Sequence, residues 1–317
     1  MKTEIFILLK NIIYLFFVIF IGYITYKKKI IDENVKDSIS TLIVKITAPI
    51  LLFTTISNTK FSINILHDVI ILIISAFFII SFLILMGYVS AKIFKLEGKT
   101  KYSHIFCSSF GNTGFLAYPL LLALYGEKGI FYAASYNIMH DFLSWSLGVR
   151  LMNKHNGHNN GSGFLNPNSI SILLGFLVFL IKGLFNLNDN IVIKFIYDAF
   201  NPLGKTTIYL SMLFIGCLLA DVSFNKAFKT YSIYSIILIK MILLPISIMF
   251  FLSLFDINRF TKLIMVMQTA MPTATISSVL AYRYNSDSEY AVKSIMLTTS
   301  IALITLPSIL YIFELLY

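Results

Sequence analysis

Helix-breaking and polar residues interrupt an otherwise apolar stretch of the sequence at 102–126. Asn112 and Thr113 are flanked by glycines, of which Gly114 is the second, and Pro119 follows. Glycine and proline disfavour a continuous helix, and an asparagine amide can donate a hydrogen bond to a carboxylate. The pattern predicts that Asn112, Thr113, Gly114 and Pro119 belong to a binding site for an anionic ligand. The alternative is that Asn112 only pairs backbone groups that the break leaves free.

A second apolar stretch, 263–285, is interrupted where Pro272 precedes Thr273, with Gln268 upstream. Lipid penalises the unpaired backbone groups of an interrupted helix, so such breaks persist where they line a cavity. Interrupted helices at corresponding positions in two halves of a chain indicate the binding site of a transporter. Pro272, Thr273 and Gln268 are therefore candidate ligand-binding residues as well. Simple kinks are the alternative explanation for both breaks.

Ionisable residues also fall inside apolar stretches, where a charge is costly and suggests a function. Lys45 could pair with a ligand carboxylate, or it could extend its ammonium to the membrane surface. Asp141, which follows His140, is a candidate for ion coupling, and the alternative is that it braces neighbouring helices. Lys240 is either a partner charge or a lysine that reaches the surface. Lys205 lies nearer a predicted helix end, where contact with headgroups is expected.

The composition indicates that these residues belong to an integral membrane protein. Of 317 residues, 57% are hydrophobic and only 13% are charged, and the mean hydropathy is +0.82. A soluble domain carries roughly 25% charged residues and could not bury so much apolar surface. The apolar runs approach the length of about 20 residues that spans hydrocarbon as a helix. They lack the alternation of barrel strands, so the predicted fold class is all-α.

Ten spans are predicted, with one long polar segment among them. This segment, 153–166, is rich in Asn, Gly and His and predicts a linker between a first five-helix repeat, 1–152, and a second, 167–317. Because five is odd, two halves of one fold must lie in opposite orientations, which is the inverted-repeat plan of many transporters. The spans are roughly 5–26, 36–57, 67–94, 101–126, 129–151, 167–186, 199–219, 230–255, 261–284 and 288–316.

Basic residues predict the orientation of these spans. Fourteen lysines and arginines flank one side and eight flank the other. By the positive-inside rule both termini lie outside and the linker is cytoplasmic, in a multi-pass protein of the cell membrane. The net charge of +10 therefore indicates orientation and lipid contacts, and no nucleic-acid partner is expected. His104 and Asp198 lie near predicted span ends and are expected to face headgroups.

The interrupted stretches resemble known sequences. GNTGFLAYPLLLALYG at 111–126 looks like the fourth-helix signature of the auxin efflux carrier family, which includes the plant PIN-formed carriers and prokaryotic permeases. The stretch 271–307 resembles the ninth and tenth helices of that family, and APILLF at 48–53 is similar to its second. The stretch 203–220 resembles the seventh helix, although Tyr209 stands where the family usually has proline. The resemblance covers essentially the whole chain.

The resemblance implies a ten-helix, five-plus-five inverted repeat in which broken helices four and nine cross near the bilayer midplane at the substrate site. It implies transport of a small organic anion, either auxin-like or a mono- or dicarboxylate. The substrate-contacting asparagine of the family falls on Asn112. The long cytoplasmic insertion of the plant members is absent, and only the short linker stands in its place.

Other classes of function have less support in the sequence. No GxxxxGK, HExxH or GxSxG motif occurs, so an enzyme is not expected, and neither a cofactor nor a metal is expected. Cys107 and Cys217 lie in apolar runs and are expected to pack as small apolar residues. A channel or a substrate-sensing membrane protein of the same fold is the alternative to a secondary transporter. The sequence leaves open proton or sodium coupling and a homodimer.

Overall fold

The computed structural model describes residues 2–154, 166–188, 190–221 and 227–317. These ranges are helical apart from turns, bends and one isolated antiparallel bridge. The predicted linker lies almost entirely outside the described residues. In the first half the helices, with π-helical segments labelled η, are α1 (Lys2–Lys27), α2 (Glu33–Leu42), η1 (Ile43–Thr47), α3 (Ala48–Asn58), α4 (Ile63–Ile93), α5 (Gly98–Ser109), η2 (Thr113–Ala117), α6 (Tyr118–Leu143), η3 (Ser144–Gly148) and α7 (Val149–Met152).

The second half is also helical. Its helices are α8 (Pro167–Phe185), α9 (Ile191–Lys205), α10 (Thr207–Asp221), α12 (Ser232–Ile236), η4 (Ile237–Leu243), α13 (Leu244–Leu252), α14 (Arg259–Thr269), α15 (Ile276–Arg283) and α16 (Ser288–Leu316).

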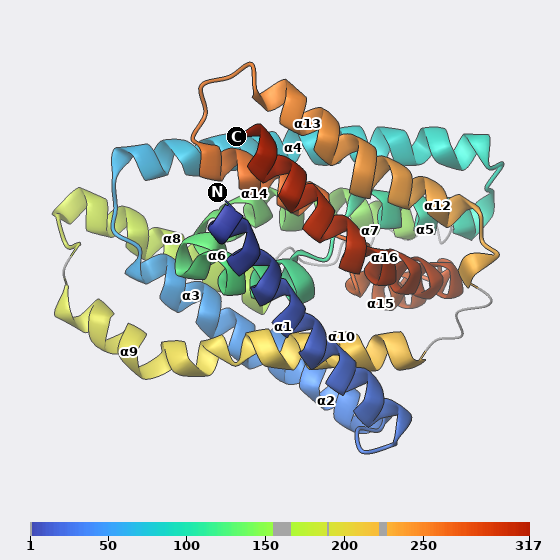
Figure 1. Cartoon of the computed structure of the whole chain (residues 1–317), viewed down its shortest axis with the longest axis horizontal. Coiled ribbons are helices and arrows are strands. Elements are labelled where there is room, and N and C mark those ends of the chain that lie inside the picture. Colours follow the sequence, from blue (N-terminus) through green and yellow to red (C-terminus); the bar gives the residue numbers. More distant parts are fainter. Residues whose placement is uncertain (1, 155–165, 189, 222–226) are drawn as a thin grey trace.

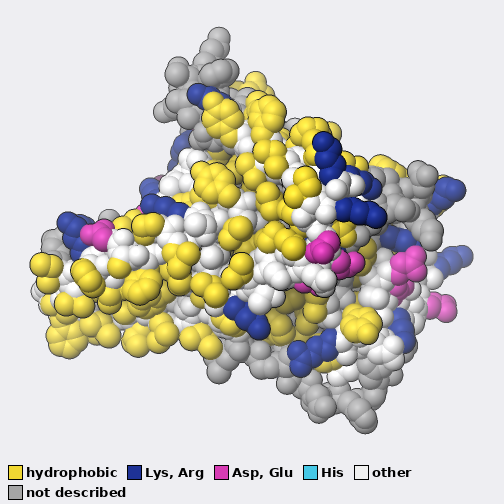
Figure 2. Space-filling view, turned by 90° about the horizontal axis from the view of Figure 1, so that it is seen from below, with side chains coloured by type: hydrophobic (Ala, Val, Ile, Leu, Met, Phe, Trp, Pro, Cys, Tyr) yellow, Lys and Arg dark blue, Asp and Glu magenta, His cyan; other side chains and the backbone are white. Residues whose placement is uncertain are grey.

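Long apolar helices confirm the predicted membrane class. Six helical segments within the described residues are long and apolar enough to cross a bilayer, and a shorter apolar helix covers Ile13–Lys27. Hydrophobic side chains cover much of the left and centre of the face seen in Figure 2, as expected of a surface that meets lipid. The chain is therefore an all-α, multi-pass membrane protein. The six segments are Glu33–Asn58, Ile63–Ile93, Pro167–Phe185, Ile191–Ala220, Ser232–Leu252 and Ser288–Leu316.

Three helix pairs join the halves of the chain through glycines. Helix α1 packs along α10, and α3 packs along α8 and α9 (Figure 1). A Cβ atom added to Gly216 would lie 2.0 Å from the carbonyl oxygen of Ile19, and one added to Gly204 would lie 2.8 Å from the Leu51 backbone. Helices in lipid approach this closely only where a small residue stands at the contact.

The structure corrects one predicted span boundary. The seventh span was expected at 199–219, but α9 begins at Ile191 and α10 follows it after Thr206. The side chain of Asn190 starts α9 by accepting hydrogen bonds from the amides of Val192 and Ile193. Asn190, Lys194 and Asp198 make this part of the sequence resemble a polar loop. The predicted seventh span therefore began too far along the chain.

One predicted headgroup contact is also wrong. His104 is fully buried, with Nε2 2.7 Å from the Ser90 hydroxyl and Nδ1 2.7 Å from the Tyr290 hydroxyl. Its helix α5 lies between α4 and α16, so this side chain faces protein rather than lipid. Lys205 is exposed, and its ammonium also lies 3.0 Å from the Glu127 carboxylate, so its contact with headgroups stays a prediction.

Candidate functional site

The two interrupted stretches cross each other, and each supplies hydrogen bonds that the other lacks. Helix α5 ends at Ser109 and η2 begins at Thr113, while α14 ends at Thr269 and α15 begins at Ile276. Gly111 and Thr273 form an antiparallel bridge between the two breaks. The amide of Asn112 donates to the carbonyl of Pro272 at 2.8 Å, and the amide of Ala274 donates to the carbonyl of Phe110 at 3.1 Å. The predicted breaks are thus confirmed, and their backbone groups are paired inside the protein.

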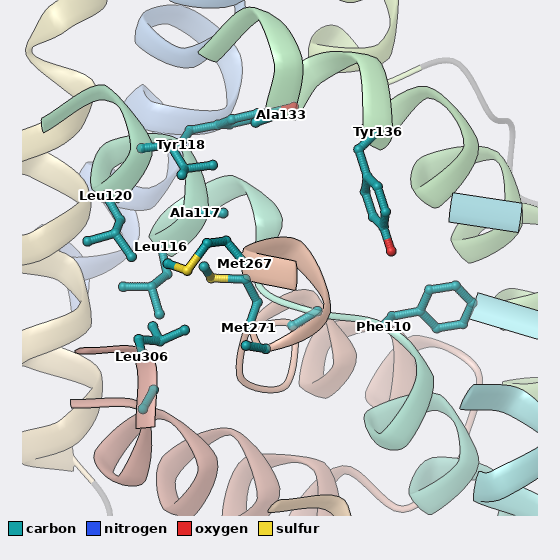
Figure 3. Packing of buried hydrophobic residues seen from close by; sticks show 14 of the residues in the cluster. Phe110, Leu116, Ala117, Tyr118, Leu120, Ala133, Tyr136, Met267, Met271 and Leu306 are labelled. Carbon is teal, nitrogen blue, oxygen red and sulfur yellow. The ribbon is translucent and has the colours of Figure 1, made fainter. Parts of the chain in front are cut away.

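Apolar packing fixes the two breaks against each other. Figure 3 shows Met267 and Met271 of the second break beside Leu116 and Ala117 of the first. A Cβ atom added to Gly111 would lie 3.1 Å from the Cβ of Met271, so only glycine fits without displacement. The crossing is therefore a packed contact between α5–η2 and α14–α15.

Polar groups brace the ends of α5. The Thr273 hydroxyl donates to the carbonyl of Cys107 at 3.1 Å, and its amide donates to the Thr298 hydroxyl at 3.1 Å. The Lys240 ammonium also points to the Cys107 carbonyl, at 3.4 Å, and its side chain is 1% exposed. A helix carries partial negative charge at its C-terminus, which a cation stabilises. Lys240 is therefore a partner charge for the end of α5 and does not reach the membrane surface.

A cavity of about 130 Å³ lies beside the crossing. Two half-helices begin at the breaks and turn their first residues toward the cavity: η2 with the part of α6 before the non-helical Gly126, and α15. The first amides of a helix lack partners within the helix and carry partial positive charge, which favours an anion. The lining residues are Val44, Gly111, Asn112, Thr113, Gly114, Phe115, Tyr118, Asn137, His140, Asp141, Ser144, Trp145, Asn166, Asn168, Ala274, Thr275 and Ile276.

Four buried polar atoms at this cavity have no hydrogen-bond partner among the residues that the structure describes. They are Asn112 Nδ2, Asn137 Oδ1, His140 Nε2 and Asn168 Oδ1, and each belongs to a residue that lines the cavity. A buried polar atom without a partner costs about 1–3 kcal/mol, so such atoms rarely gather without a reason. Their convergence on one cavity is the arrangement expected of a polar ligand site.

Asn112 combines the two roles that the sequence left open. Its side-chain oxygen accepts a hydrogen bond from the amide of Phe115 at 3.1 Å and so caps the half-helix that begins at Thr113. Its side-chain nitrogen is left without a partner at the cavity. Gly114 keeps the space open, since a Cβ atom added there would meet nothing within 4 Å.

Asp141 and His140 form a pair on the α6 side of the cavity. The His140 Nδ1 atom lies 3.2 Å from Asp141 Oδ1, and the Ser169 hydroxyl donates to Asp141 Oδ2 at 3.4 Å. The His140 ring packs edge-on against Phe110 with a centroid distance of 5.7 Å. Asp141 thus braces α8 and orients the histidine, while it also borders the cavity.

A second cavity, of about 430 Å³, adjoins the first. Both cavities are bordered by Val44, Phe115, Thr275 and Ile276. From this shared wall the larger cavity extends to Lys36 in the first turn of α2. Its lining is otherwise mostly apolar, so the polar ligand groups are concentrated in the smaller cavity.

The structure brings some of the predicted site residues together and not others. Asn112, Thr113, Gly114 and Asp141 border the smaller cavity. Pro272 and Thr273 belong to the crossing and are buried behind it, and Pro119 is buried in the first turn of α6. Gln268 is buried and donates to the carbonyl of Ala133 at 3.3 Å, and Lys45 is exposed; neither borders either cavity.

A polar stripe that includes this pair was not predicted from the sequence. Asn137, His140 and Asp141 of α6 and Ser144 at the start of η3 recur at intervals of three and four residues, which aligns them on one helix face. That spacing in an apolar span was the signal that could have identified Asn137 and His140. Asn166 and Asn168 flank the first proline of α8 and were assigned to the linker or its edge.

Comparison with known families identifies the class of this membrane protein. A family described as "Membrane transport protein" matches residues 7–163 and 160–310. The chain belongs to this family. It is the family of the auxin efflux carriers, so the resemblance seen in the sequence is confirmed, and the protein is a membrane transporter rather than an enzyme.

Two relatives of this transporter come from archaea. An uncharacterized transporter of Methanocaldococcus jannaschii is 26% identical over 291 residues, which cover 91% of this chain and 93% of the relative. An uncharacterized transporter of Methanothermobacter thermautotrophicus is 21% identical over 297 residues, with the same coverage of both chains. The likeness to this chain therefore extends over nearly the whole length of each relative.

Proposed function

We propose that this transporter is a secondary carrier that moves a small organic anion, auxin-like or a mono- or dicarboxylate, through the cavity beside the crossing. The observation that carries the proposal is the convergence of four unpartnered polar atoms and two half-helix N-termini on one cavity. The helix ends and the amide of Asn112 favour negative charge without a full buried ion pair. Thr113 and Gly114, which also belong to the first break, would contact the anion together with Asn112.

The proposal includes an architecture of ten spans in two inverted five-helix repeats, 1–152 and 167–317, with a cytoplasmic linker between them. Two reciprocal contacts support it. The first span packs on the seventh, as α1 on α10, and the sixth packs on the second, as α8 on α3. An inverted repeat that exchanges spans one and six, and two and seven, predicts that these two contacts occur together.

The larger cavity would be the route from the cytoplasm to the site. It runs from the shared wall at Phe115 to Lys36, which lies beside the first loop and so on the predicted cytoplasmic side of the cell membrane. Its apolar lining would accommodate the non-polar part of an organic acid while the carboxylate meets the helix ends. A sensor or channel of the same fold is the alternative function.

Counterflow in proteoliposomes tests the proposal. Vesicles loaded with an unlabelled acid are diluted into the same labelled acid, using lactate, malonate, succinate and indole-3-acetate in turn, with protein-free vesicles as the background. A carrier gives saturable, transient accumulation of label for at least one acid. A channel gives flux without counterflow, and a sensor gives no flux, so either result with every acid would contradict a carrier of these anions.

A further inference from the structure

His140 places a buried ring nitrogen at the wall of the smaller cavity. The residue is 6% exposed, and its Nε2 atom has no hydrogen-bond partner among the described residues. Its other ring nitrogen lies 3.2 Å from Asp141 Oδ1. A carboxylate accepts hydrogen bonds only, so Asp141 requires a proton on Nδ1, and in the neutral ring Nε2 is then an unprotonated acceptor.

A neutral His140 would therefore oppose the anion that the rest of the cavity attracts. A ligand carboxylate near Asn112 would meet the lone pair of Nε2, which repels it. After a proton binds Nε2, the imidazolium donates one hydrogen bond to Asp141 and a second to the ligand carboxylate. Hydrogen bonds to charged groups are the stronger kind, at about 1.5–3 kcal/mol.

We infer that His140 is the proton-binding site of this carrier, and that it takes up one proton from water with each organic anion and releases it when the anion leaves. The inference rests on the proposed function and names its coupling ion. No covalent bond other than the N–H bond forms or breaks. Asp141 acts as a positioning residue that holds the ring and balances the imidazolium, which makes the entry of a monocarboxylate electroneutral.

The surroundings of His140 supply no competing charge. Among the described residues that line the cavity, Asp141 is the only charged side chain, and Tyr118 is the only other titratable one besides the histidine. From α5 the ring meets the phenyl group of Phe110, and α8 contributes the uncharged side chains of Asn168 and Ser169. The histidine is thus the one basic side chain among the described residues that line this cavity.

Proton movement during transport tests the inference. Proteoliposomes with a trapped pH-sensitive dye are given labelled lactate, or the other acids of the panel if lactate is not carried. The parent protein should acidify the lumen by one proton per lactate, and a potassium diffusion potential should change the lactate rate less than about twofold. Lactate flux without acidification would overturn the role of His140 and leave the carrier proposal standing. Absence of flux for every acid would overturn both.

A matched pair of variants isolates the residue. In His140→Gln the amide nitrogen donates permanently, so lactate flux should no longer acidify the lumen and should become sensitive to the membrane potential. His67→Gln changes a histidine exposed on α4 and should behave like the parent. Unchanged acidification by His140→Gln would overturn the inference. If His140→Gln does not fold, the parent protein is tested by calorimetry instead. Lactate binding is measured in buffers of different ionisation enthalpy, which reports how many protons are taken up. Binding without proton uptake would contradict the inference.

Discussion

At the level of single residues, the first break requires a polar side chain at one position, Asn112, and no side chain at another, Gly114. Asn112 contributes one polar atom to its own half-helix and another to the cavity. Gly114 contributes no side chain, and nothing lies within 4 Å of the place where a Cβ would be. One residue therefore supplies the hydrogen bond for the ligand, and the other supplies the space.

The empty space at Gly114 predicts a graded effect of side-chain size. Gly114→Ala should fold normally and keep most of its counterflow, because an added methyl group meets open space. Gly114→Leu should also fold, but its side chain would occupy the 130 Å³ cavity and lower counterflow by more than about tenfold, since even one misplaced methylene is worth about 1–3 kcal/mol. Full counterflow by a correctly inserted Gly114→Leu would exclude this cavity as the ligand site.

Residue types in the sequence predicted some of the residues that line the cavity. The others depend on the direction of side chains, which the sequence does not show. Asn112, Thr113 and Gly114 were identified because a break in an apolar run is visible in sequence. Lys45 lies away from the cavity, and the sequence did not predict this, because polar residues occur all along the span 36–57 and do not mark the face that meets the protein. The four-residue stripe of α6 and η3 was visible as a spacing, but its ligand face became identifiable only once Phe110 and Asn168 lay beside it.

At the scale of helices, glycines determine how closely the two halves approach. Gly22 on α1 and Gly216 on α10 each face a carbonyl of the opposite helix. The Cys217 thiol of α10 also donates to the carbonyl of Gly22 at 3.6 Å, and close packing at the two glycines brings the helices near enough for this contact. The sequence predicted that α1 and α10 exist, but nothing in their apolar composition predicted that they meet.

This contact predicts a stability effect separate from transport chemistry. A Cβ atom in Gly216→Val would lie 2.0 Å from the backbone oxygen of Ile19, so α1 and α10 must separate, and overpacking of this kind costs about 1–3 kcal/mol. The variant should lose its fold at a lower temperature in detergent. Gly114→Ala is the control and should unfold with the parent. Equal unfolding temperatures for Gly216→Val and the parent would mean that the contact is looser than described.

At the scale of the whole molecule, crossing breaks explain how irregular backbone persists in an apolar protein. The bonds between Asn112 and Pro272 and between Phe110 and Ala274 join chain segments about 160 residues apart. The sequence predicted two breaks in register from glycine and proline alone. It could not predict the pairing of their backbones, because hydrogen bonds between distant segments leave no pattern in residue types.

The proposed topology predicts opposite labelling of two exposed loop lysines. Lys60 lies between α3 and α4, and Lys95 lies between α4 and α5. If the termini are outside, Lys60→Cys should react with an impermeant thiol reagent in intact cells, and Lys95→Cys should react only after the cells are opened. The native Cys107 and Cys217 are buried and should give little background. The reverse labelling pattern would invert the topology.

Counterflow by Asn112→Asp tests whether an organic anion binds beside Asn112. The new carboxylate can still cap the amide of Phe115, so the half-helix should form, but it replaces the unpartnered donor with a negative charge. Loss of one hydrogen bond to a charged ligand alone costs about 1.5–3 kcal/mol, so apparent affinity should fall on the order of ten- to a hundredfold. Lys45→Gln, at an exposed position away from the cavity, should remain within about twofold of the parent. If Asn112→Asp gave the same counterflow as the parent at matched insertion, this would contradict binding of the anion beside Asn112.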